Sequence, residues 1–178
     1  MFNIFRFKKN RPKLDEVNSN QVLDEILYLS NREDYLGKAA LAKHASKAAI
    51  KLGEYDKAWS LLHEQKMLYL SHAQNQKWNA KYIFALEGTV SEELANILRL
   101  EGKHDQALVH ILYWIITSQN TTKRQEKKLI AYLGRCKFKS VTIEDIKSFI
   151  EGNKPHPDLA TIQFKVRDWR DSQDKALR

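Results

Sequence analysis

Hydrophobic residues recur at helical spacing along most of this chain, and glycine, asparagine or a capping residue separates one run from the next. The runs cover about residues 20–30, 34–52, 55 onward, 94–100, 104–118, 123–133, 143–152 and 158–169. No stretch alternates apolar and polar residues with the period of two that a half-buried strand requires. The pattern therefore predicts an all-α protein of about seven or eight helices.

Two of the predicted helix boundaries share one residue pattern. A glycine is followed two positions later by an aromatic ring or histidine, and three positions further on by alanine. Glycine ends a helix in the left-handed conformation without a steric penalty. We therefore expect the chain to form two antiparallel helical hairpins, with turns at these residues: Gly53, Tyr55 and Ala58, and Gly102, His104 and Ala107.

The composition of two runs predicts how they pack. The run at 34–52 is rich in alanine, as a helix needs if it packs tightly on both sides. The run at 104–118 is apolar on most sides, which is typical of a helix in the interior or at an oligomer interface. Exposed tryptophan or tyrosine on that helix would make a homodimer interface.

The region between the two glycine turns is less clearly divided. The helix from Tyr55 either extends to Leu86 or breaks near Asn75. Gly88, followed by Ser91 and Glu92, indicates the start of a new helix.

The two glycine turns resemble the turn of the tetratricopeptide repeat, in which Gly-x-Tyr-x-x-Ala joins two helices and a large apolar residue follows. Leu62 and Ile111 occupy that last position, and the resemblance covers about residues 38–72 and 88–120. It implies a right-handed array of helical hairpins. The glycines are 49 residues apart, whereas regular repeats recur at about 34 residues, and no third such turn follows residue 121. A general helical bundle that uses glycine to end its helices is the alternative.

The resemblance also implies a binding site. In that family the first helix of each repeat lines a concave groove that holds a peptide, and the basic residues here would suit an acidic peptide or a terminal carboxylate. An ordinary solvated face is the competing interpretation of such a lysine row. The residues implied are Lys43, His44, Lys47, Lys51, Glu92, Asn96 and Arg99.

The net charge of +8 is unevenly distributed, and residues 121–140 hold seven basic residues against one acidic residue. Several cations on one surface are what phosphate binding needs, and Tyr132 and Phe138 lie nearby. This cluster suggests an alternative role as a nucleic-acid-associated regulator, although it carries no helix-turn-helix or zinc-finger motif. Its basic residues are Lys123, Arg124, Lys127, Lys128, Arg135, Lys137 and Lys139.

The ends of the chain differ from the middle. Residues 1–19 are basic and aromatic, with Phe2, Phe5 and Phe7 among the cations, and are expected to form a flexible arm that touches an anionic membrane or stays unbound. Residues 20–170 are expected to form a single helical domain, followed by a frayed tail at 171–178.

The sequence predicts neither a membrane span nor a secretory signal. No apolar run is long enough to cross a bilayer, and no continuous apolar segment resembles a secretory signal. The single Cys136 fits a reducing compartment, so we expect a cytoplasmic protein.

The remaining residues argue against catalysis. His63-Glu64 lacks the second histidine of a zinc-protease motif, and His104 and His110 share no helix face. We therefore expect a protein-interaction adaptor that is not an enzyme and has no cofactor or metal.

Overall fold

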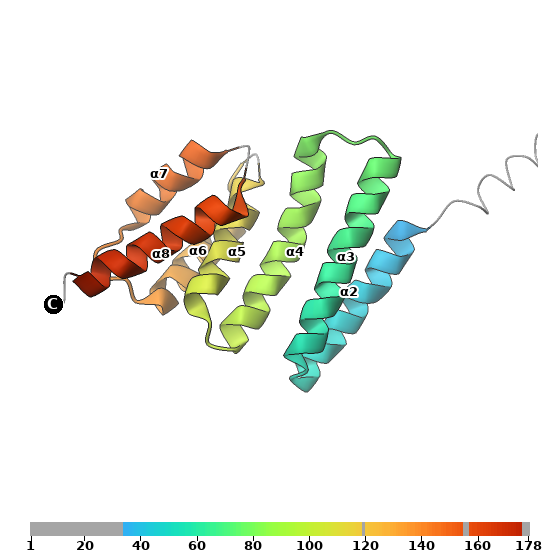
Figure 1. Ribbon diagram of the computed structural model, residues 1–178, viewed down its shortest axis with the longest axis horizontal. Coiled ribbons are helices and arrows are strands. Elements are labelled where there is room, and N and C mark those ends of the chain that lie inside the picture. Colours follow the sequence, from blue (N-terminus) through green and yellow to red (C-terminus); the bar gives the residue numbers. More distant parts are fainter. Residues whose placement is uncertain (1–33, 119, 155–156, 176–178) are drawn as a thin grey trace, which may run out of the picture. The chain divides into compact units, whose positions relative to one another are not determined.

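The computed structural model describes residues 34–118, 120–154 and 157–175, and these residues form helices and no strands (Figure 1). The prediction of an all-α fold is confirmed for this part of the chain. The chain divides into two units, Met1–Asp34 and Tyr35–Arg178, and every described helix belongs to the second. The predicted arm at 1–19 and the helix expected from residue 20 lie outside the described residues. The helices are α2 (Tyr35–Leu52), α3 (Tyr55–Asn75), α4 (Ala80–Leu100), α5 (His104–Ile116), α6 (Lys123–Cys136), α7 (Ile143–Asn153) and α8 (Leu159–Lys175).

Helix α5 is the central element of the core. From Ala107 to Ile116 every residue except His110 is buried, because α4, α6, α7 and α8 all pack against this one helix. The prediction that this run lies in the interior is confirmed. Tyr113 and Trp114 are among the buried residues, so α5 does not present the exposed aromatic rings that the suggested homodimer interface requires.

The glycine turns after α2 and α4 have the same structure. Gly53 and Gly102 each adopt a φ of +76°, the left-handed conformation. After α2, the Gly53 N–H donates to the Ile50 carbonyl and the Glu54 N–H donates to the Ala49 carbonyl. The same two bonds recur after α4 at equivalent positions. Both helices therefore end in a Schellman motif, which satisfies their last carbonyl groups.

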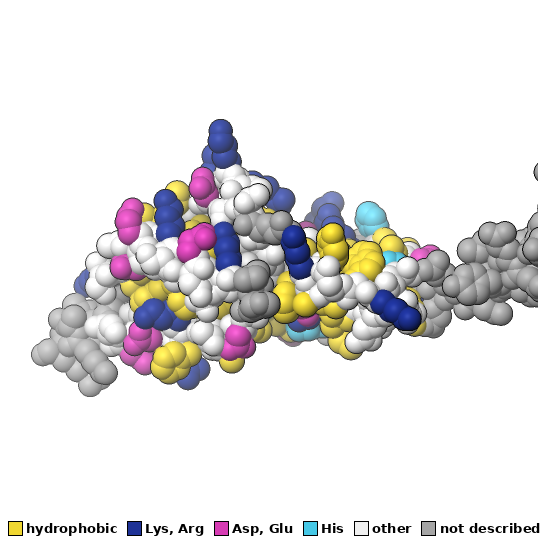
Figure 2. All heavy atoms as spheres, turned by 90° about the horizontal axis from the view of Figure 1, so that it is seen from above, with side chains coloured by type: hydrophobic (Ala, Val, Ile, Leu, Met, Phe, Trp, Pro, Cys, Tyr) yellow, Lys and Arg dark blue, Asp and Glu magenta, His cyan; other side chains and the backbone are white. Residues whose placement is uncertain are grey.

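A third turn of the same kind ends α3, and it settles the boundary that the sequence leaves open. Lys77 adopts a φ of +52°, and the Trp78 N–H donates to the Ala73 carbonyl at 2.9 Å. Asn79 then caps α4, since its side chain accepts from the Tyr82 N–H. Hydrophobic side chains lie exposed at this end of the described unit, over the α3–α4 connection (Figure 2). Trp78 and Tyr82, which pack ring against ring, belong to this exposed surface.

The expectation that Gly88 starts a helix is wrong, because Gly88 lies in the middle of α4. A Cβ atom at this position would lie 2.2 Å from Thr117 Oγ1 and 3.3 Å from Thr117 Cβ. Glycine is therefore needed here because α4 approaches the end of α5 closely.

The later helices begin as the sequence predicts. Thr122 and Thr142 each form a capping box with the residue three positions on, Gln125 and Asp145. Helix α7 ends at Asn153, one residue past the predicted end. Helix α8 continues to Lys175, so residues 171–175 of the expected tail are helical.

Gly88→Ala is expected to destabilise the protein by about 1–3 kcal/mol, because the new methyl group forces Thr117 out of its place and breaks its hydrogen bond to the Trp114 carbonyl. Adding Thr117→Ala should recover part of this loss. Gly134→Ala on the exposed side of α6 is the control, because no atom lies within 4 Å of the added group and alanine favours a helix there. Chemical denaturation measures all four proteins, and stabilisation by Gly88→Ala alone would contradict the close approach.

Lys77→Gly is expected to stabilise the protein by about 1 kcal/mol, because glycine adopts the left-handed conformation at no steric cost. Lys137→Gly, at the left-handed cap of α6, should give a similar gain. Both are read as a rise in the melting temperature. Lower melting temperatures, as glycine produces within a helix, would show that these turns are formed differently.

Candidate functional site: the outer face of helix α2

Helix α2 uses one narrow face for packing. Its buried residues are Ala39, Ala42, Ser46 and Ala49, and the helix packs mainly against α3. Small side chains here let the two helix backbones approach closely. The expectation that this alanine-rich helix packs tightly on both sides is wrong, because the opposite side is exposed.

That exposed side carries a continuous apolar stripe. Leu41 and Leu52 are 72% and 73% exposed, and the exposed Ala45 and Ala48 lie between them. The spacing of four, three and four residues places all four on one face of the helix. We call Leu41, Ala45, Ala48 and Leu52 the outer stripe of α2.

Basic residues flank the outer stripe. Helix α2 contains four lysines and no acidic residue. The exposed His44, Lys47 and Lys51 lie on one side of the stripe, and Lys38 lies on the other. Lys43 is half-buried, nearer the α3 contact. The face therefore combines large exposed leucines with positive charge, and a positively charged surface attracts negatively charged molecules.

Of the α4 residues of the predicted peptide groove, Glu92 pairs with another helix, and Asn96 and Arg99 bond each other. Glu92 is only 8% exposed, and its carboxylate pairs with Arg124 and Lys128 of α6. Asn96 Oδ1 accepts a hydrogen bond of 2.7 Å from Arg99 Nη2. Glu92 thus holds two cations of α6.

The same contact changes the interpretation of the basic cluster on α6. Arg124 and Lys128 both lie over the Trp114 ring, at 5.4 and 5.8 Å from its centre, while they pair with Glu92. They therefore join α6 to α4 and α5. Lys123, Lys127, Arg135, Lys137 and Lys139 of the predicted set are exposed.

The two aromatic residues near this cluster are not free to stack on bases. Tyr132 is buried among the residues of the α5 core. Phe138 is half-buried, packs near Trp169, and has the Arg170 guanidinium 4.6 Å above its ring. The cluster thus lacks the exposed aromatic platform that single-stranded nucleic-acid binding uses.

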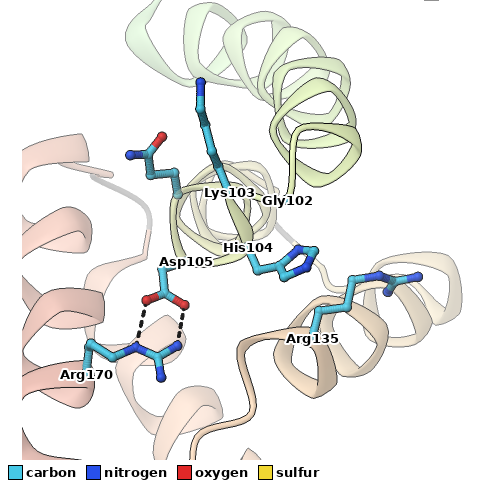
Figure 3. Close-up of a pocket in the computed structure, with 7 residues that line it drawn as sticks. Gly102, Lys103, His104, Asp105, Arg135 and Arg170 are labelled. Atoms are coloured by element: carbon cyan, nitrogen blue, oxygen red, sulfur yellow. Dashed lines mark hydrogen bonds and ion pairs between the residues drawn. The ribbon is translucent and has the colours of Figure 1, made fainter. Parts of the chain in front are cut away.

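A pocket of about 360 Å³ lies at the start of α5. Its main contact is structural, because Arg170 of α8 donates two hydrogen bonds to Asp105, at 2.7 and 2.8 Å (Figure 3). Arg170 donates a third hydrogen bond to the Cys136 carbonyl. Lys103 points away from this pair and forms an ion pair with Glu101 at 3.2 Å. The hydrogen bonds of Arg170 therefore join α8 to α5 and α6. Two cations that line the pocket, Arg170 and Lys103, are already paired with carboxylates of this chain.

Two titratable groups lie in or beside the core: Cys136 is buried, and His110 is half-buried. Cys136 is 3% exposed, and burial raises the pKa of its thiol to about 12, so it remains protonated. Burial, with His63 and Lys66 nearby, lowers the pKa of His110 to about 4. Among the described residues no three His, Cys, Asp or Glu side chains are grouped closely enough to hold a metal ion. No helix in the described ranges has both the length and the apolar content needed to cross a membrane.

Comparisons with models of protein families, with curated proteins and with solved structures give no significant match.

Sequence reasoning predicts the lysines of this face but misses the outer stripe beside them. The 4-3-4 spacing of Leu41, Ala45, Ala48 and Leu52 is visible in the sequence. This spacing does not reveal that the residues are exposed, because the same spacing is expected of a buried helix face.

His110 provides a test of the ring contact between α5 and Trp59 of α3. Because its folded pKa is about 4 and its unfolded pKa is about 6.5, the unfolded state binds the extra proton between these values. Stability should therefore fall by about 3 kcal/mol as the pH is lowered from 6.5 to 4. His110→Phe, which keeps a ring against Trp59, should remove that part of the pH dependence in denaturation curves. An unchanged slope in the variant would show that His110 is protonated in the folded protein.

Proposed function

We propose that this chain is a protein-binding module that binds an acidic segment of a partner protein along the outer face of α2. It acts by presenting a preformed helix surface and performs no catalysis, so little ordering of the module itself opposes binding. The observation that carries the proposal is the outer stripe, two leucines more than 70% exposed on a helix with four lysines and no acidic residue.

We further propose that α2–α3 and α4–α5 are antiparallel hairpins of a tetratricopeptide-like, right-handed array. The bond-for-bond identity of the turns at Gly53 and Gly102 supports this arrangement. Ala58 and Ala107, which follow these turns, are both fully buried, in keeping with the close helix approach of that repeat.

The charge of α2 supports an acidic partner over a neutral one. Its lysines stand beside exposed leucines, so a bound carboxylate would be partly shielded from water, where its attraction to lysine is stronger than on an open surface. Individual surface ion pairs contribute only about 0–1 kcal/mol, so binding needs the leucines as well.

The nucleic-acid alternative has weaker support. Of its cations, Arg124 and Lys128 are paired with Glu92, and the aromatic rings beside the cluster belong to the core or its edge. The capture experiment distinguishes nucleic-acid binding from binding of a protein partner.

The full-length chain is immobilised and used to capture proteins from a cell lysate, with and without nuclease treatment, and capture is measured by quantitative mass spectrometry. Lys47→Glu combined with Lys51→Glu should reduce capture of the specific partner by about tenfold or more, because it removes the net positive charge of α2. The matched control, Lys123→Glu with Lys127→Glu, makes the same change in net charge on exposed positions of α6 and should leave capture unchanged.

Circular dichroism confirms that both variants are folded. If nuclease or the α6 variant removes the captured material while the α2 variant keeps it, the protein is a nucleic-acid-associated one and the proposal is wrong.

A further inference from the structure

We infer that the partner segment binds as an amphipathic α-helix lying along the outer stripe of α2, with acidic residues beside its apolar face. This inference rests on the proposed function and specifies the class of partner. It follows from the spacing of the stripe, the size of its residues and the charge around it.

The spacing of the stripe matches a second helix. Leu41, Ala45, Ala48 and Leu52 repeat every three or four residues, which is the seam along which two helices pack side chain into groove. The seam runs for about 16 Å, or three turns, at about 1.5 Å per residue. An extended peptide, by contrast, gains its affinity from the free edge of a sheet, and the described ranges of this chain form no strand.

The sizes of the residues specify the partner's side chains. The exposed alanines at the centre of the stripe, Ala45 and Ala48, leave room between the exposed Leu41 and Leu52 at its ends. A partner helix therefore fits best when a large apolar residue lies opposite the alanines, since alternating large and small residues interlock. The residues next to its seam should be aspartate or glutamate, facing Lys47 and Lys51.

Charge argues against a second copy of this chain as the occupant. Pairing two α2 helices through the stripe would bring together lysines from both copies, and α2 has no acidic residue to neutralise them. An acidic helix from another protein meets opposite charge along the same seam.

The experiment uses three labelled peptides, each about 18 residues long, which is long enough for a helix to form on binding. The first two have the same composition of glutamate, leucine, alanine and glutamine. In the first, leucines follow the three-and-four spacing and glutamates flank them. In the second, the order is scrambled so that the leucines surround the helix. The third is the first with one central proline. Fluorescence anisotropy measures their affinity for the full-length chain.

The first peptide should bind about tenfold or more tightly than the other two, and its circular dichroism should become helical on binding. Leu41→Gln with Leu52→Gln should weaken it by about tenfold. The control is Ile130→Gln with Phe164→Gln, which removes two leucine-sized or larger side chains that are 61% and 72% exposed on other helices, and should leave the affinity unchanged.

The failures are distinguishable. If all three peptides bind equally and all are weakened by Lys47→Glu with Lys51→Glu, the helix inference is wrong and the acidic-partner function stands. If no peptide binds, or if binding ignores both α2 variants, the proposed function is wrong as well. Self-association of the chain that disappears with Leu41→Gln and Leu52→Gln would make a second copy the occupant and overturn the inference.

Discussion

The burial of α5 is the constraint on which the rest of the described structure depends. A helix that is apolar on nearly every side must be covered on every side, and α4, α6, α7 and α8 all use their apolar faces to do so. Helix α2 is not among these helices and packs mainly on α3. Among the described residues the outer stripe stays exposed, and the proposed function assigns it to a partner protein.

The charged residues around α5 and those on α2 also differ in their contacts. Around α5, carboxylates fix the surrounding helices, since Glu92 holds two cations of α6 and Asp105 holds the guanidinium of Arg170. These cations therefore hold helices of the fold together. On α2 the basic residues have no carboxylate within their own helix. A basic cluster thus says little about function until its internal partners are known, as Arg124 and Lys128 of α6 illustrate.

The sequence predicts what depends on neighbouring residues and misses what depends on distant ones. Helical periodicity, the glycine turns and the threonine caps are local signals, and the structure has helices, turns and caps there. Gly88 misled the prediction because glycine serves both to end helices and to let them approach, and only Thr117, far along the chain, decides between these uses. Lys77 gave no signal because a lysine that adopts the left-handed conformation looks like any other. The role of Glu92 depends on cations more than thirty residues away.

The central claim is that a partner binds on α2 and not on the basic cluster of residues 123–139. Nuclear magnetic resonance of the ¹⁵N-labelled full-length chain, titrated with the amphipathic acidic peptide, tests it most directly. The amide shifts that move should belong to residues 38–52 and the adjoining surface of α3. Shifts confined to residues 123–139, or to the pocket between Gly102 and Arg170, would contradict it.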